Sequence, residues 1–168
     1  MAHFAEIKSS DNVVLRVVVV NNSDVEANGG DYSATAETWV ANNIAQDPVI
    51  LSQGDYPDTY WKQTSYNNNA RYNYAEIDGT WDNTNQAFIA QKPFESWTLD
   101  SSYRWVAPVA DPSTQEIDGI TILMSWDETN SQWLAYKSDG TGGEYVWNVD
   151  NSAWESNGNP TVLTGSLT

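Results

Sequence analysis

The sequence predicts a mainly β fold with one short helix, in which an N-terminal α+β unit precedes a meander of antiparallel β-hairpins. Two observations lead to this prediction. Short runs of β-branched and aromatic residues recur along most of the chain, and turn-forming Asn, Asp, Ser and Gly separate them at intervals of about ten residues, as in antiparallel β proteins. Only one segment combines a capping residue with the apolar spacing of a helix.

The chain begins with a predicted hairpin. Its arms are residues 3–7 and 13–20, and the second arm reads VVLRVVVV. β-Branched residues suit a pleated strand that is largely buried, so this arm should lie inside the protein. Residues 21–32 are rich in Asn, Asp and Gly and are expected to form a loop.

The one predicted helix covers residues 33–46, SATAETWVANNIAQ. Ser33 or Thr35 can cap its first turn, because a hydroxyl oxygen accepts a hydrogen bond from a free backbone N–H there. Glu37 suits the positive end of the helix dipole. The Asp47-Pro48 pair is expected to end the helix.

Short strands are predicted along the rest of the chain. They cover residues 60–66, 72–77, 79–81, 87–90, 97–99, 103–106, 120–126, 132–136, 144–147 and 153–155. A proline-bearing stretch interrupts them and is the best domain boundary. The resulting division is an N-terminal α+β domain at residues 1–107, a linker at 108–118, a small β-meander at 119–156 and an extended tail at 157–168. Whether residues 119–156 fold independently is left open.

The chain is strongly acidic. Asp and Glu outnumber Lys and Arg by 23 to 7, and the formal net charge is −16. Such a surface repels phosphate backbones and anionic membranes, so neither nucleic acid nor a membrane is an expected partner. Solubility is one explanation of the charge; adhesion to a basic protein surface or dependence on divalent cations are others. No signal peptide or membrane span is evident, which predicts synthesis in the cytoplasm.

One nine-residue pattern occurs three times. It reads TWDNTNQAF at residues 80–88, SWDETNSQW at 125–133 and VWNVDNSAW at 146–154. The shared Asp/Asn-x-x-Asn core predicts a hairpin tip, in which the first residue accepts backbone hydrogen bonds and the last Asn adopts the left-handed conformation. A four-residue loop would place the flanking aromatic residues opposite each other, whereas a three-residue loop would place them on opposite faces.

Three interpretations of this repeat compete. We favour a structural hairpin whose aromatic rings face inward, since small β-meanders bury aromatic residues to complete their cores. A glycan site is the second interpretation, because exposed Trp rings stack on sugars; its candidate partner or glycan contacts are Trp126, Trp133, Trp147, Trp154 and Asp127. Calcium is the third, although the roughly twelve-residue loop and distal Glu of a known calcium loop are missing.

Catalytic chemistry is not indicated. The only histidine is His3, whose place beside the N-terminus argues against a Ser-His-Asp triad; a histidine metal cluster would need more than one histidine, and there is no cysteine. The paired acids Asp127 and Glu128 are best explained as solvated turn residues. We therefore expect no enzyme activity, no cofactor and no bound metal.

Several motifs occur in an order typical of one family. They are MAHFA at residues 1–5, WKQTSYN at 61–67, RYNYA at 71–75, WDNTNQAFI at 81–89, KPFESWTL at 92–99 and WVAP at 105–108. In these motifs the chain resembles a family of small virion structural proteins of cyanophages and other marine phages. Residues 31–46 follow the family pattern poorly, and residues 119–156 extend beyond its single hairpin.

The resemblance implies a place in the virus particle, after synthesis in the host cytoplasm. The expected function is that of a capsid decoration (cement) protein on the outer head surface. Its partner would be the major capsid protein or another virion protein, bound by symmetric copies or a homo-oligomer. The alternative is a tail or tail-fibre accessory protein that binds host glycans through the Trp-rich hairpins. A free carbohydrate-binding module is a third, more distant hypothesis.

Overall fold

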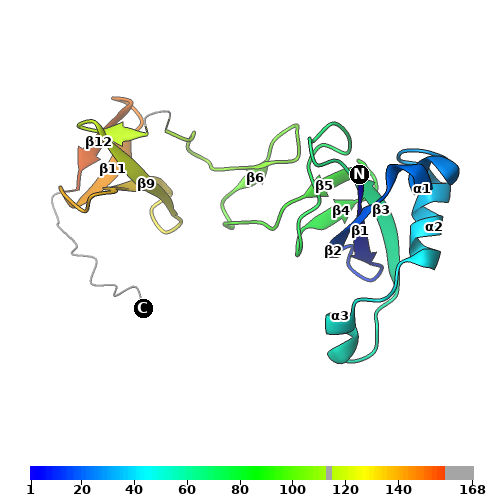
Figure 1. Cartoon of the computed structure of the whole chain (residues 1–168). Helices are drawn as coiled ribbons and strands as arrows, with labels where there is room; N and C mark the ends of the chain where they lie inside the picture. Colours follow the sequence, from blue (N-terminus) through cyan, green and yellow to red (C-terminus); the bar gives the residue numbers. More distant parts are fainter. Residues whose placement is uncertain (113–114, 158–168) are drawn as a thin grey trace. The chain divides into compact units, whose positions relative to one another are not determined.

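The computed structural model describes residues 1–112 and 115–157 (Figure 1). Its contacts divide the chain into two compact units. Unit 1 comprises Met1–Pro93 and Leu99–Trp105, and unit 2 comprises Phe94–Thr98 and the chain from Val106 onward. With 36% of residues in strands and 14% in helices, the predicted mainly β fold class is confirmed.

A three-stranded antiparallel sheet forms the centre of unit 1. Its strands are β1 (Ala2–Lys8), β2 (Val14–Val20) and β3 (Thr59–Thr64), in the order β2-β1-β3. The predicted first hairpin is therefore present, with β1 as the middle strand. Asn12 closes its turn in the left-handed conformation, at φ 61°.

Both faces of this sheet are covered. Because side chains alternate along a strand, Phe4 and Ala5 of β1 point to opposite faces. The first core comprises Ala2, Phe4, Val20, Val25, Ala36, Val40 and Trp61. The second core comprises Ala5, Ile7, Val14, Ala75, Trp81 and Phe88. Helices supply residues to the first core, and a hairpin supplies residues to the second.

The helices depart from the prediction of a single helix. Unit 1 contains α1 (Asn22–Ala27), α2 (Ala34–Asn43) and α3 (Pro48–Ser52). The predicted loop over residues 21–32 was wrong at α1. Val25 is the only apolar branched residue in this Asn- and Asp-rich segment, and its burial in the first core holds the short helix in place.

The helix ends follow capping chemistry. The Ser33 hydroxyl oxygen accepts a hydrogen bond from the backbone N–H of Ala36 (3.1 Å), as predicted for the start of α2. The helix ends at Asn43, before the expected stop. Asp47 instead caps α3 by accepting hydrogen bonds from the N–H groups of Val49 and Ile50, and Pro48 takes the first helical position.

Two short antiparallel pairs follow the central sheet. They are β4 (Thr80–Asp82) with β5 (Ala87–Ile89), and β6 (Thr98–Leu99) with β7 (Trp105–Val106). The strand predicted over residues 72–77 does not form. Arg71 and Tyr72 both have left-handed backbone, at φ 57° and 65°, which interrupts any extended run at its start.

Unit 2 is a five-stranded antiparallel meander that curls toward a barrel. Its strands are β8 (Glu116–Ile117), β9 (Ile120–Asp127), β10 (Gln132–Lys137), β11 (Glu144–Asn148) and β12 (Ala153–Ser156), in the order β12-β11-β10-β9-β8. Strand β8 lies inside the predicted linker 108–118, because its register with β9 extends the sheet by one strand. The predicted tail 157–168 lies outside the described residues, apart from Asn157. The domain bounds stay a prediction.

Candidate functional site

A buried carboxylate joins α2 to the central sheet. Glu37, on α2, is only 6% exposed. One of its oxygens lies 2.8 Å from the Arg71 guanidinium and 3.2 Å from the backbone nitrogen of Gln63, and the other lies 2.7 Å from the Lys62 ammonium. Two cations and a backbone donor offset the cost of removing this charge from water. From its place in the helix, Glu37 is expected only to interact with the helix dipole, and no local pattern predicts this buried network.

Gln63 and Arg71 extend this network. The Gln63 side chain accepts a hydrogen bond from the backbone N–H of Tyr32 (2.6 Å) and donates one to Asp31 (2.7 Å). Arg71 donates to the backbone carbonyl of Gln63 (2.6 Å), and its guanidinium lies 5.3 Å from the ring centre of Tyr32. These two motif residues therefore hold the loop before α2 against β3.

Other residues of the resemblance motifs also have structural partners. The Thr64 hydroxyl accepts from the backbone N–H of Ala75 (2.8 Å). The side-chain amide of Asn73 donates to three backbone carbonyls, those of Phe88, Ser102 and Tyr103. The Asn73 contacts connect the segment after β3 to strand β5 and to the loop between β6 and β7. The presence of Thr64 and Asn73 in the motifs is therefore explained by hydrogen bonds that hold unit 1 together.

Three motif residues remain at the surface. His3, Tyr66 and Tyr74 form an aromatic group in which each pair of ring centres lies 5.7–5.8 Å apart. Tyr66 is 72% exposed. Partial burial, with a smaller effect of the neighbouring Tyr66, raises the pKa of Tyr74 above its ordinary value. This group is a surface that a protein partner can contact, since interfaces are rich in tyrosine.

The repeated hairpins have four-residue loops. The strand register pairs Asp82 with Ala87, Asp127 with Gln132 and Asn148 with Ala153. The flanking aromatic residues are therefore directly opposite each other in all three hairpins. Their ring centres lie 4.7 Å apart in the first hairpin, 5.3 Å in the second and 5.2 Å in the third. Cross-strand pairing of these rings stabilises each hairpin.

The tips use the predicted turn chemistry with one correction. One Asp82 oxygen accepts from the backbone N–H groups of Thr84 and Asn85, at 2.9 and 3.0 Å. The left-handed residue is Gln86, at φ 54°, rather than Asn85. The Asn85 side chain instead donates a hydrogen bond to the second Asp82 oxygen (2.7 Å), and this side-chain hydrogen bond helps to close the turn.

The second and third tips follow the same rule. Their left-handed residues are Ser131 and Ser152, which directly follow Asn130 and Asn151, the last residues of the Asp/Asn-x-x-Asn cores. Asp127 accepts from the side chain of Asn130 (2.7 Å) and from two backbone N–H groups of its turn. Its carboxylate is therefore used within the hairpin, although the sequence made it a candidate glycan contact.

The three aromatic pairs differ in burial. Trp81 and Phe88 are each 1% exposed, whereas Trp126 is 6% and Trp133 is 8% exposed. These four rings face inward, as the structural interpretation of the repeat expects. The third pair, Trp147 and Trp154, is only partly buried. Of the four candidate tryptophans, this pair has the most surface available to a ligand.

A third tryptophan explains the burial of the second pair. Trp97 lies 6.3 Å from Trp126 and 5.8 Å from Trp133 between ring centres, in edge-to-face arrangements. The Trp126 indole nitrogen donates to Glu128 (2.8 Å), which also accepts from the Ser96 hydroxyl (2.7 Å). Glu128 thus has structural partners and is not the solvated turn residue that the sequence predicted.

The opposite side of the unit 2 sheet carries a polar cross-strand pair. The Tyr136 hydroxyl donates a hydrogen bond to the Glu144 carboxylate between β10 and β11. This hydrogen bond, with partial burial, raises the pKa of Tyr136 to about 12. The hydroxyl therefore stays protonated at physiological pH and acts as a donor within the sheet.

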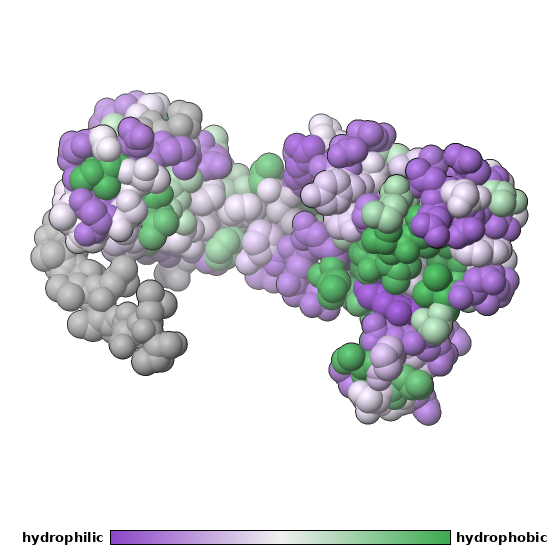
Figure 2. All heavy atoms as spheres, viewed as in Figure 1, coloured by the Kyte–Doolittle hydropathy of each residue, from purple (hydrophilic) through white to green (hydrophobic). Residues whose placement is uncertain are grey.

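Most cations of the chain are used internally. The sequence has seven Lys and Arg residues. Among the described residues, at least five of them form ion pairs with carboxylates of the same chain: Lys8 with Asp11, Arg16 with Glu6 and Asp47, Lys62 and Arg71 with Glu37, and Lys137 with Asp118. Hydrophilic residues cover much of the visible face of each unit (Figure 2). The excess of acidic residues therefore determines the charge presented to a partner.

Within residues 1–112 and 115–157, no group of three or more His, Cys, Asp or Glu side chains is placed to hold a metal ion. No helix in the same ranges is long and apolar enough to cross a membrane. Comparisons with protein-family models, curated proteins and solved structures give no match to this chain. Function is therefore argued from the residues and their geometry.

The Glu37 network gives a first prediction. Replacing Glu37 with Gln should lower the free energy of unfolding by about 3 kcal/mol, because Lys62 and Arg71 remain partly buried without their anion. Urea denaturation followed by circular dichroism measures this loss. The exposed Glu26→Gln variant on α1 is the control and should change stability by less than about 0.5 kcal/mol. Equal losses in both variants would contradict the proposed role of the network.

The hairpin tips give a second prediction, on acid stability. Hydrogen bonds from the side chains of Asn85 and Asn130, with those from turn N–H groups, lower the pKa of Asp82 and Asp127. A carboxyl whose pKa is lowered by folding stabilises the protein above its unfolded-state pKa, and this contribution is lost as pH falls through the folded-state pKa. The melting temperature should therefore fall between about pH 5 and pH 3.

The double variant Asp82→Asn and Asp127→Asn tests the source of this acid dependence. Asn148 performs the same turn role in the third hairpin, so asparagine is compatible with the tip. The double variant should show a smaller fall in melting temperature between pH 5 and pH 3 than the parent protein. An identical pH profile for both proteins would rule out the turn carboxylates as the cause.

The unequal burial of the Trp pairs gives a third prediction. Trp133→Ala should cost about 3–5 kcal/mol of unfolding free energy, because it leaves a cavity beside Trp97 and Trp126. Trp154→Ala should cost less, since its ring is partly exposed before the substitution. Urea denaturation with near-ultraviolet circular dichroism compares the two variants. A greater loss for Trp154→Ala would show that the third pair, and not the second, is the core of unit 2.

Proposed function

We propose that the protein is a virion structural protein of a tailed marine phage that decorates the outer surface of the head. The observation that supports this proposal most is the internal use of cations. In the described part of the chain, at least five of the seven Lys and Arg residues are paired with the chain's own carboxylates, while the net charge is −16. The surface left for a partner is acidic, and it complements a basic protein surface on a shell.

Acidic surface residues are present at several separate places in unit 1. They include Glu26, Asp55, Asp58, Glu76 and Asp78, all of which are exposed. Copies of such a protein repel one another in solution, and this repulsion keeps them soluble before assembly. A basic shell neutralises that repulsion and lets many copies bind side by side. The motif resemblance to virion structural proteins agrees with this role.

The proposed role is binding rather than catalysis. The buried carboxylates, which are the groups most suited to altered reactivity, have structural partners. Glu6 accepts hydrogen bonds from Arg16 (2.6 Å), Tyr56 (2.9 Å) and Thr59 (2.8 Å). Glu37 is held by Lys62 and Arg71. Carboxylates with these partners stabilise the fold instead of serving as free acids or bases.

Mixing the purified protein with empty phage heads that lack it tests the proposal. We expect binding in many symmetric copies over the shell, greater resistance of the heads to heat, and weaker binding as salt rises. Sedimentation measures the stoichiometry, and electron microscopy locates the bound copies. Attachment at a single vertex or to the tail would overturn the head assignment and support a tail accessory role.

A pair of exposed acids provides a matched variant. Glu76→Gln with Asp78→Asn removes two negative charges from one exposed turn of unit 1. This variant should keep the fold and reduce the salt dependence of head binding, because fewer charges are neutralised on contact. If the salt dependence and the affinity stay unchanged in this variant and in the corresponding Asp55 and Asp58 variant, these acids do not face the shell.

A further inference from the structure

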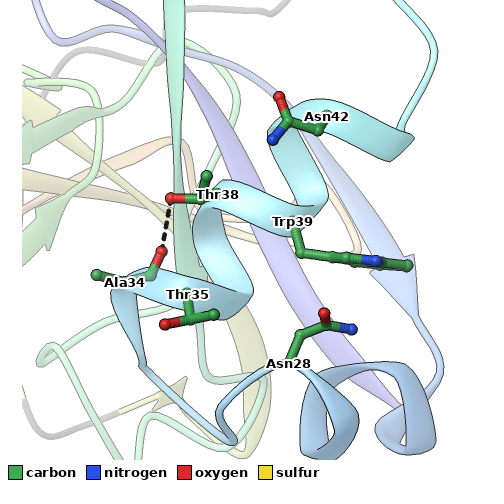
Figure 3. Close-up of a pocket in the computed structure, with 6 residues that line it drawn as sticks. All are labelled: Asn28, Ala34, Thr35, Thr38, Trp39 and Asn42. Carbon is green, nitrogen blue, oxygen red and sulfur yellow. Dashed lines mark hydrogen bonds between the residues drawn. The ribbon is translucent and has the colours of Figure 1, made fainter.

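A shallow pocket lies between the end of α1 and one face of α2 (Figure 3). Its volume is about 460 Å³, and its lining consists of Asn28, Ala34, Thr35, Thr38, Trp39 and Asn42. Because the pocket is shallow and open, it can contact one face of a small molecule and does not enclose it. None of the sequence motifs discussed above includes these residues, so the pocket is separate from the Trp-rich hairpins.

The helical period explains why these side chains meet. Thr35, Thr38, Trp39 and Asn42 are spaced at i, i+3, i+4 and i+7, which places them on one face of α2. Ala36 and Val40, on another face, are buried in the first core. The helix is therefore fixed against the sheet, and the face with Trp39 is held in a constant position. This spacing was the sequence signal that could have revealed the pocket.

The indole of Trp39 is the main apolar surface of the pocket. Figure 3 shows its ring between the side chains of Asn28 and Asn42. Trp39 packs against the first core while remaining partly exposed, so the ring is both anchored and accessible. An anchored indole offers a flat apolar surface at little entropic cost to a ligand.

The polar groups around the ring have defined hydrogen-bonding roles. The Asn28 amide nitrogen donates to the backbone carbonyl of Asp24 (2.7 Å), which orients the amide and leaves its oxygen as the acceptor. In Figure 3 that oxygen points toward Trp39. Thr38 donates to the carbonyl of Ala34 (2.8 Å). The Thr35 hydroxyl and the exposed Asn42 amide can each donate and accept.

We propose that this pocket binds a neutral saccharide ring. All six lining side chains are uncharged, and the nearby Glu37 is occupied by Lys62 and Arg71. A sugar presents an apolar C–H face, which suits Trp39, and ring hydroxyls, which suit amides and hydroxyls. A nucleotide also has a flat ring, but its phosphates are repelled by the −16 charge. The pocket is independent of the proposed decoration function.

Nuclear magnetic resonance titration tests this inference on the full chain. The probes are glucose, galactose, mannose and N-acetylglucosamine, each added up to about 50 mM. At least one sugar should cause saturable shifts of the Trp39 indole N–H and of the side-chain amides of Asn28 and Asn42. The inference is overturned if none of the four sugars produces saturable shifts, or if the shifts centre on Trp147 and Trp154.

Neighbouring asparagines on α2 provide the matched variants. Asn42→Ala removes a pocket amide and should weaken sugar binding about 3- to 10-fold, the usual effect of one lost hydrogen bond. Asn43→Ala removes an exposed amide that donates to the Trp39 carbonyl outside the pocket lining, and should leave affinity unchanged. Trp39→Phe keeps a ring against the core and should weaken binding several-fold. Unchanged affinity in Asn42→Ala and Trp39→Phe would also overturn the inference.

Discussion

The burial of β1 on both faces is the constraint on which unit 1 depends. Phe4 and Ile7 are each 0% exposed and point to opposite sides of the middle strand. A strand buried in this way needs one layer on each side, and these layers are the helices α1 and α2 and the hairpin β4–β5. Glu6 lies in the same strand, and it accepts hydrogen bonds from Arg16, from Tyr56 just before β3 and from Thr59 at the start of β3. The positions of later segments follow from covering this one strand.

The same ion pairs link stability to surface charge. Glu6 and Glu37 are buried and require cations, and they engage three of the seven Lys and Arg residues of the chain. A chain with few cations that places them at buried anions has a surface dominated by its remaining acids. The proposed attachment to a basic shell therefore arises from how the fold satisfies its internal carboxylates. The Trp39 pocket, with its uncharged lining, is chemically different from that acidic surface.

The repeated hairpins show which features local sequence encodes. The Asp/Asn-x-x-Asn core predicted three hairpin tips, and all three form, because their hydrogen bonds join residues that are two or three positions apart. The left-handed residue was misplaced by one position, since the Asn side chain bonds to the first turn residue instead. Helix α1 was missed because its stability comes from the contact of Val25 with distant core residues. Burial of the three aromatic pairs differs for the same reason: Trp97 covers one pair, and nothing near the repeat itself encodes that contact.

The sequence by itself determined the mainly β class, the first hairpin, the capped start of α2 and the repeated turns. Each of these depends on alternation or hydrogen bonding over a few neighbouring residues. Only the tertiary structure decided that Trp126 and Trp133 face inward, that Glu37 holds two cations, and that Asn28 joins α2 in lining a pocket at Trp39. Those outcomes depend on residues that are distant in sequence and meet only after the sheet is covered. The physical reason is that a short segment can complete its own turn and cap hydrogen bonds. Burial of a side chain instead requires contacts from the whole folded unit.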